Sequence, residues 1–215
     1  MLKKKQAIVI YILMLVLIAA YAFYVYRDKK GETNGELKGD DIPCVSLKEN
    51  ETVDVEIPQN LHGSRTAGQC AHSLMVEGRC EEAWVNGKGN CVARMNQSQV
   101  QNEYNRAVKE INSEKQAYDE RGTIAFDISY DCRNITYYIN DNTEFMNFWG
   151  ATWTLPLSCI EVQLYAGVPL DDTDVHLKII YPPTGKTVFE VNYWEFTDPI
   201  DEEKWNSLVE EAKKE

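Results

Sequence analysis

Residues 98–130 read SQVQNEYNRAVKEINSEKQAYDERGTIAFDISY, and the spacing of apolar residues changes within this stretch. As far as Arg121, apolar residues recur every three or four positions, which is typical of a helix with one buried face. They are Val100, Tyr104, Val108, Ile111 and Tyr118. From Ile124 onward they recur at every second position, as in a half-buried strand. The change of period at Gly122 predicts an α+β fold.

The predicted helix occupies residues 97–122. Ser98 and Gln101 have the spacing of a capping box at its amino end, and Gly122 is a typical carboxy-terminal stop. We interpret the apolar stripe as a face that packs against its own domain. Binding of a partner helix is the alternative.

Residues 123–215 are predicted to form an antiparallel β domain with a carboxy-terminal helix. Strands are expected where apolar and polar residues alternate, at 124–130, 135–139, 160–164, 175–181 and 189–193. Short turns such as Pro182-Pro183-Thr184-Gly185 favour an antiparallel sheet or sandwich. The final helix should begin at Pro199, with Asp198 as its cap. It should dock through Ile200, Trp205, Leu208, Val209 and Ala212.

Residues 44–96 contain four of the six cysteines and little periodicity. Val53, Val55 and Ile57 predict one strand that ends at Pro58, and the remainder has no sustained period. We therefore expect a subdomain held together by disulfides.

An even number of cysteines in a domain outside the cytoplasm favours three disulfides. We predict that Cys132 pairs with Cys159, and that the other four pair among themselves. These four are Cys44, Cys70, Cys80 and Cys91. A zinc site of Cys70, His72, Cys80 and Cys91 is the alternative, but the chain has no Cys-x-x-Cys pair and the spacings match no familiar ligand pattern.

Residues 7–26 are uncharged and lie between Lys3-Lys4-Lys5 and Arg27, Lys29 and Lys30. Twenty helical residues span about 30 Å, so residues 1–30 are predicted to be a cytoplasmic tip and a transmembrane signal-anchor. A glycine-rich stalk follows at 31–43. Ala20-Tyr21-Ala22 also fits a cleavable signal peptide, which is the alternative.

Basic residues flank both ends of the apolar segment, so the positive-inside rule does not decide its orientation. The six cysteines all follow it, which favours a single-pass protein of the cell membrane with its bulk on the extracytoplasmic side. Three candidate glycosylation sequons agree with this orientation. They begin at Asn50, Asn96 and Asn134. Residues 31–215 carry 16 basic and 33 acidic side chains, a net charge of −17 that argues against nucleic-acid binding.

Three groups of residues are candidates for sites. The segment Phe148-Trp149-Gly150-Ala151-Thr152-Trp153 either fills the core or forms a recognition patch, so Phe148, Trp149 and Trp153 are the partner-surface candidates. Asp171, Asp172 and Asp174 form a weak candidate for calcium. We identify no catalytic residue, because there is no Gly-x-Ser-x-Gly elbow and 33 acids do not single out a pair.

These features predict a membrane-anchored extracytoplasmic binding or structural component of a membrane or cell-surface protein assembly. Its partners would be the membrane and other membrane or surface proteins. One alternative is an extracytoplasmic hydrolase that uses an unidentified carboxylate pair. Another is a pilin-like filament subunit, although the chain lacks the Gly-Phe cleavage site and early Glu of that family.

Overall fold

The computed structural model describes residues 43–196 and 200–214. The predicted transmembrane helix and all but the last residue of the predicted stalk lie outside the described residues. Within the described ranges, no helix combines the length and the apolar composition needed to span a bilayer.

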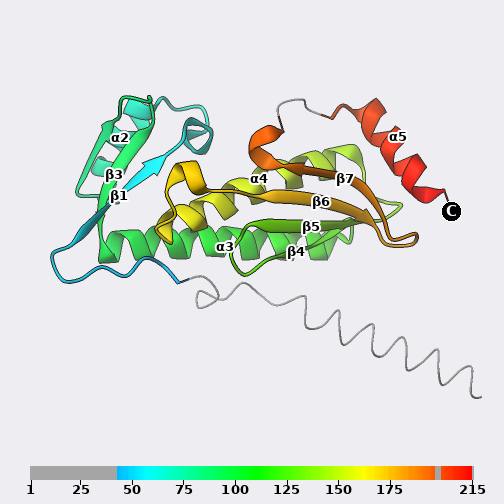
Figure 1. Cartoon of the computed structure of the whole chain (residues 1–215), viewed down its shortest axis with the longest axis horizontal. Coiled ribbons are helices and arrows are strands. Elements are labelled where there is room, and N and C mark those ends of the chain that lie inside the picture. Colours follow the sequence, from blue (N-terminus) through cyan, green and yellow to red (C-terminus); the bar gives the residue numbers. More distant parts are fainter. Residues whose placement is uncertain (1–42, 197–199, 215) are drawn as a thin grey trace, which may run out of the picture. The chain divides into compact units, whose positions relative to one another are not determined.

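The described part is α+β, as predicted, with two sheets and four α-helices (Figure 1). Its first half contains β1 (Thr52–Ile57), η1 (Gln59–His62), α2 (Ala67–Val76), β2 (Glu82–Val85), β3 (Cys91–Asn96) and α3 (Gln97–Arg121). Its second half contains β4 (Ile124–Ile128), β5 (Asn134–Ile139), α4 (Phe145–Tyr165), η2 (Leu170–Asp172), β6 (His176–Tyr181), β7 (Lys186–Asn192), η3 (Tyr193–Glu195) and α5 (Glu202–Lys213).

Residues 44–96 contain more regular structure than predicted. The strand that ends before Pro58 is confirmed, and it joins an antiparallel sheet of order β1-β3-β2 on which α2 packs. The expectation of an otherwise aperiodic segment was wrong. In strand β3, the consecutive residues Cys91, Val92 and Ala93 are all buried. Polar and apolar residues therefore do not alternate, and the strand cannot be recognised from its spacing.

Helix α3 and its buried stripe are confirmed, and Gly122 ends it with a φ of 64° in the left-handed region. The predicted cap was wrong. The backbone N–H of Gln99 donates to the Asn96 side chain, and the Asn96 N–H donates to the Gln99 side chain. Strand β3 leads directly into the helix, so Asn96, an effective cap residue, occupies the junction ahead of Ser98.

The predicted strand at 160–164 was wrong, because residues 145–165 form the single helix α4. Much of the circumference of this helix is buried, so its sequence shows no polar face and therefore no helical period. Pro156 lies inside it and adds a misleading signal, since proline usually marks a helix end.

The second sheet is mixed and not purely antiparallel. Its order is β4-β5-β6-β7, and β5 and β6 run parallel with Ile135 opposite Leu177. Helix α4 is the reason, because a parallel pair needs a long crossover connection between its strands. The other two pairs are antiparallel, and the β6–β7 hairpin predicted at Pro182–Gly185 is confirmed.

Helix α5 begins at Glu202 and is capped by Asp201, whose side chain accepts a hydrogen bond from the Lys204 N–H. The predicted start at Pro199 was wrong, because Ile200 and Asp201 precede the first turn of the helix, and the predicted cap, Asp198, lies outside the described residues. The predicted docking is confirmed, because Ile200, Trp205 and Ala212 are buried and α5 packs on β7. Leu208 and Val209 are half-buried against the same core.

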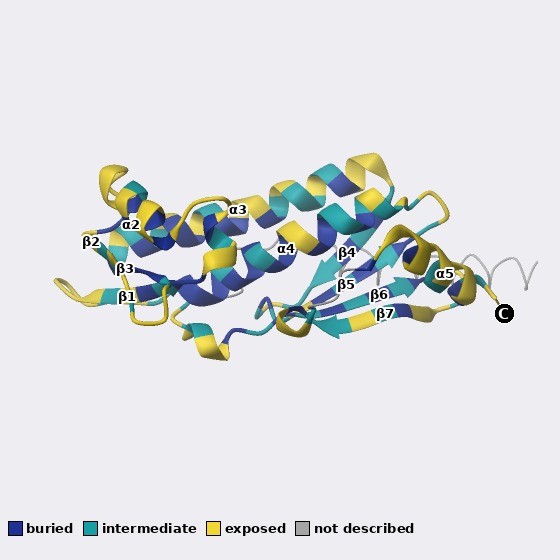
Figure 2. Cartoon of the chain, turned by 90° about the horizontal axis from the view of Figure 1, so that it is seen from above, coloured by how far each residue is buried: buried dark blue, intermediate teal, exposed yellow. Residues whose placement is uncertain are grey.

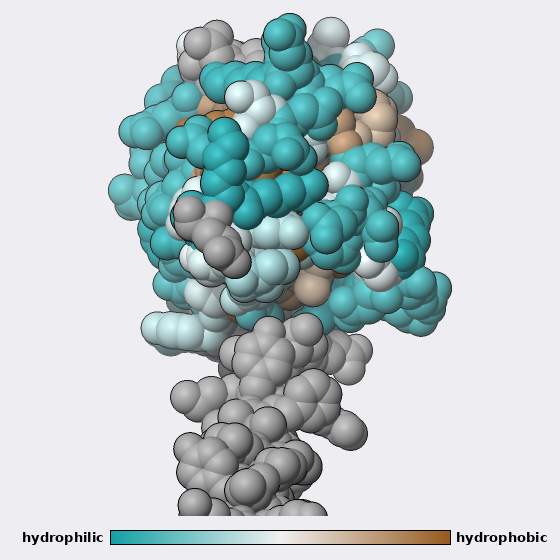
Figure 3. Space-filling view, turned by 90° about the vertical axis from the view of Figure 1, so that its right-hand side faces the viewer, coloured by the Kyte–Doolittle hydropathy of each residue, from teal (hydrophilic) through white to brown (hydrophobic). Residues whose placement is uncertain are grey.

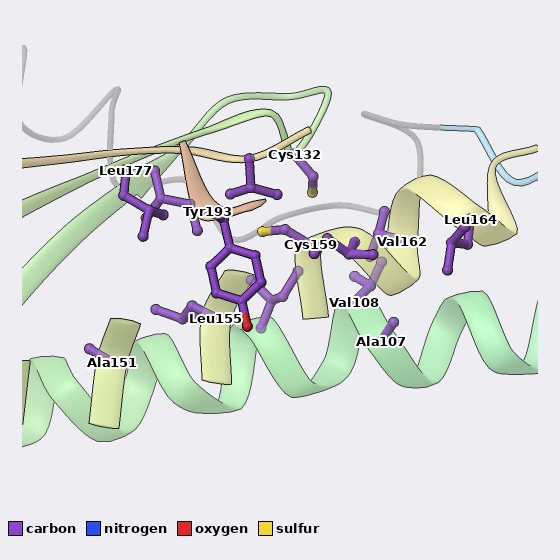
Figure 4. Close-up of a cluster of buried hydrophobic side chains, with 14 of the residues drawn as sticks. Ala107, Val108, Cys132, Ala151, Leu155, Cys159, Val162, Leu164, Leu177 and Tyr193 are labelled. Carbon is purple, nitrogen blue, oxygen red and sulfur yellow. The ribbon is translucent and has the colours of Figure 1, made fainter. Parts of the chain in front are cut away.

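The core lies between the mixed sheet, α4 and α3 (Figures 2 and 4). Leu177 of β6, Leu155 and Cys159 of α4, and Val108 of α3 all belong to this cluster (Figure 4). Gly150 lets α4 approach α3 closely, since a Cβ at this position would lie 3.2 Å from the hydroxyl of Tyr118.

Candidate functional site

A cleft of about 620 Å³ lies between η1, α3 and α4. Helix α3 presents Arg106, Lys109 and Glu110 to it, and α4 presents Leu157 and Glu161 from positions one turn apart. Because residues three or four apart share a helix face, each helix contributes one continuous wall. The cleft is therefore lined by charges of both signs with an apolar strip.

A buried acid beside this cleft pairs with two arginines. Glu103 of α3 is 4% exposed and accepts hydrogen bonds from Arg79 (2.7 Å, Nε to Oε1) and Arg106 (3.0 Å, Nε to Oε2). Burial alone would raise the pKa of Glu103, but the two guanidinium groups outweigh it and lower that pKa. Arg79 lies between α2 and β2, so this cluster joins the amino-terminal sheet region to α3.

Glu161 is the unusual group in the cleft. Its side chain is 14% exposed, Oε1 lies 3.6 Å from Arg106 Nη2, and Oε2 is buried without a hydrogen-bond partner. Burial raises the pKa of Glu161 to about 7, although Arg106 opposes the shift. Glu110 pairs with the same guanidinium at 3.2 Å. The wall of the cleft thus holds a carboxyl group that exchanges a proton near neutral pH.

The Glu161→Gln variant should be more stable than the wild type at pH 8, by about 2 kcal/mol. The pKa of Glu161 lies above its ordinary value of 4.5 in the folded state, so ionisation destabilises the fold as pH rises from about 4.5 to about 7. The neutral amide removes this cost, which already includes the opposing attraction of Arg106. Urea unfolding at pH 8 and pH 4.5 should show a difference only at the higher pH, and an equal difference at both would contradict the assignment.

The aromatic segment divides between the core and the surface. Phe148 is 1% exposed and stacks on Trp205, with ring centroids 4.0 Å apart. Its assignment to a partner surface was therefore wrong, because the helix turns this residue inward. Trp149 is half-buried and Trp153 is 44% exposed, and their ring centroids are 5.5 Å apart.

Phe145, Trp149 and Trp153 form what we call the aromatic ladder, with Phe145 and Trp149 centroids 6.0 Å apart. At the same four-residue spacing, Leu157 and Glu161 continue the ladder into the cleft. Along this row, the cleft therefore begins about one turn beyond Trp153, although each four-residue step also rotates the row by about 40° round the helix. On the face shown in Figure 3, hydrophilic side chains predominate and only small apolar areas are uncovered.

The structure brings the predicted pair Cys132 and Cys159 together. Both are fully buried in one cluster (Figure 4), and a hydrogen bond between the thiols raises the pKa of Cys159, with burial adding to the effect. Among the described residues, which include all six cysteines, no pair lies at bonding distance. The Cys132–Cys159 disulfide thus remains a prediction.

The other four cysteines do not form one group. Cys70 and Cys91 are in contact and Cys80 lies near both, whereas the Cys44 thiol donates to the carbonyl of Tyr165 at 3.5 Å. His72, the histidine of the alternative zinc site, is exposed. His62 lies beside Cys70 and Cys91 instead. Sequence reasoning missed His62 because no ligand motif links it to these cysteines.

The candidate sequons differ in their surroundings. Asn50 and Asn134 are exposed, as an acceptor side chain must be. Asn96 is half-buried, caps α3 and donates to Glu81 Oε1 at 3.1 Å, so its amide is already engaged. Glycosylation at Asn50 and Asn134 remains a prediction.

The three aspartates proposed as weak calcium ligands do not converge. Asp171 pairs with Lys88 at 2.8 Å, and Asp174 accepts a hydrogen bond from Asn192. In the part of the chain that the structure describes, the only cluster of three His, Cys or acidic side chains with adjacent ligand atoms is His62, Cys70 and Cys91.

No protein-family model matches this chain, and neither a curated protein nor a solved structure matches it significantly. What the surface of α4 can bind must therefore be inferred from its own geometry and charge.

Proposed function

We propose that this chain is a membrane-anchored extracytoplasmic component of a membrane or cell-surface assembly. It binds a partner protein through the α4 surface. The observation that supports this best is the aromatic ladder, which leaves Trp153 44% exposed on a helix most of whose residues are buried. Exposed tryptophans on a rigid element are the usual anchors of protein interfaces.

The composition of the cleft favours a protein segment as the ligand. Arg106 and Lys109 alternate with Glu110 and Glu161, which suits a chain that carries both charges and apolar side chains. A polyanion would be repelled by the net charge of −17 on residues 31–215. The uncharged residues 7–26 support attachment to the membrane. A partner anchored in the same membrane would have a high effective concentration near the α4 surface.

The Trp153→Ala variant of the full chain should lose at least about 30-fold in partner affinity, the effect of a hot-spot residue of about 2 kcal/mol. Photocrosslinking in intact membranes, with the crosslinker placed at position 157, should give a specific adduct that disappears in this variant. The matched control is Tyr130→Ala, which removes an aromatic side chain 73% exposed outside α4. Identical adducts in both variants would contradict the proposal.

A hydrolase that uses two carboxylates is the second candidate, and Glu161 is the observation that favours it. A carboxyl group with a pKa of about 7 beside the second acid Glu110 has the properties of a general acid. A screen with nitrophenyl glycosides and esters tests this function. If Glu161 is the general acid, the Glu161→Gln variant should not hydrolyse a substrate that the wild type hydrolyses. Hydrolysis by this variant would exclude Glu161 as the acid.

A further inference from the structure

One ring nitrogen of His62 and the sulfur atoms of Cys70 and Cys91 all lie within 4.8 Å of one another. They come from three different elements, since His62 ends η1, Cys70 lies in α2 and Cys91 begins β3. All three side chains are buried, with exposed fractions of 2%, 6% and 0%. The fold therefore gathers imidazole and thiol groups at one enclosed point.

The protonation state of His62 follows from its hydrogen bond. Its Nε2 lies 3.0 Å from the carbonyl oxygen of Ile57. Because a carbonyl can only accept, Nε2 carries the proton and Nδ1 presents a lone pair. Nδ1 is buried and has no hydrogen-bond partner. Metal-binding histidines have this arrangement, in which a carbonyl orients the ring and the other nitrogen binds the ion.

Cys80 is our choice for a fourth donor, although its sulfur does not lie within 4.8 Å of all three other ligand atoms. It is 5% exposed, follows α2 and interacts electrostatically with both Cys70 and Cys91. A single disulfide among these three cysteines would leave one thiol unpaired and the Nδ1 of His62 without a partner. A metal ion would engage His62, Cys70 and Cys91 where they lie, and Cys80 after a shift of its side chain.

We propose that His62, Cys70, Cys80 and Cys91 form a closed structural site for a divalent cation of the Zn²⁺ type. Three thiolates and one imidazole are a known tetrahedral ligand set for zinc, and hard cations such as calcium prefer oxygen ligands. Burial of the four groups leaves no position open to solvent, as in structural sites and unlike catalytic ones. The ion would hold η1, which also lines the cleft, and α2 against the sheet.

The test uses the full chain, purified in detergent under reducing conditions, loaded with Zn²⁺ and freed of excess metal. We expect one zinc per chain by elemental analysis. Loss of zinc is expected in Cys70→Ser and Cys91→Ser, while Cys44→Ser should retain it as the matched control. Co²⁺ in place of Zn²⁺ should give the intense visible bands of a tetrahedral site with sulfur ligands.

Three results would overturn the site: no retained zinc in the wild type, zinc retained in Cys70→Ser, or a Cys70–Cys91 disulfide in protein isolated from membranes. Zinc retained in Cys80→Ser would overturn the assignment of the fourth ligand. If the serine variants do not fold, a measurement on the wild type still tests whether a metal ion stabilises the protein. A chelator should lower its melting temperature, and an unchanged melting temperature would contradict a structural metal.

Discussion

Replacing Trp205 by Ala is expected to lower the free energy of unfolding by about 3–5 kcal/mol. The indole is 1% exposed and stacks on Phe148 with an interplanar angle of 13°. This contact joins α5, the last element of the described chain, to α4, which lies in the middle of the fold. Removing the indole leaves a cavity of about its own size and removes the main contact that holds α5 against α4. Urea unfolding, followed by circular dichroism, measures the change.

The matched control for this experiment is Trp153→Ala on the neighbouring helix. Trp153 is 44% exposed, so its removal should change the free energy of unfolding by less than about 1 kcal/mol. The two variants thus separate a tryptophan of the core from a tryptophan of the proposed binding surface. Equal losses of stability in both would show that the aromatic ladder also belongs to the core.

Replacing Glu103 by Ala should destabilise the fold by about 3 kcal/mol. The carboxylate is 4% exposed and pairs with both Arg79 and Arg106, so its loss removes the most deeply buried countercharge of two partly buried guanidinium groups. Arg79 would keep only Glu77 as a partner, and Arg106 only Glu110 and Glu161. The pKa of Glu103 is lowered in the folded state, so the ionised side chain stabilises the fold fully at pH values above 4.5, the ordinary pKa of a glutamate. That stability is lost as pH falls through the folded pKa. Unfolding measured at pH 7 should show the full difference between wild type and variant.

Glu110→Ala is the control for the buried cluster. Glu110 pairs with the same Arg106, but its side chain is 48% exposed, so solvent screens the pair and its removal should cost less than about 1 kcal/mol. A similar loss of unfolding free energy in Glu103→Ala and Glu110→Ala would contradict the view that burial makes Glu103 the larger contributor to stability.

Elements with one buried and one exposed face were predictable from sequence. Helix α3 has such faces, strands β4, β5 and β6 alternate between buried and mostly half-buried positions, and helical spacing or alternation identified all of them. Phe126 and Tyr137 lie on the buried side, as their spacing predicts. The same reasoning failed for α4, because a helix buried on most sides has no polar face to set its period.

The candidate site was less predictable than the fold. The sequence singled out Trp149 and Trp153 by aromatic density, but it gave equal weight to Phe148, which the helix turns into the core. Glu161 is one acid among 34 in the chain, and only its burial beside Arg106 distinguishes it. A pKa of about 7 is a property of that environment and leaves no signal in the sequence.

By itself, the sequence determined the α+β class and the positions of the periodic elements, since these depend on local spacing and one buried face. Tertiary structure alone decided the parallel pairing of β5 with β6, because that depends on how α4 crosses the sheet. It also brought His62 beside Cys70 and Cys91 from three separate elements. Contacts between residues distant in the chain arise from packing, and packing is a property of the whole fold.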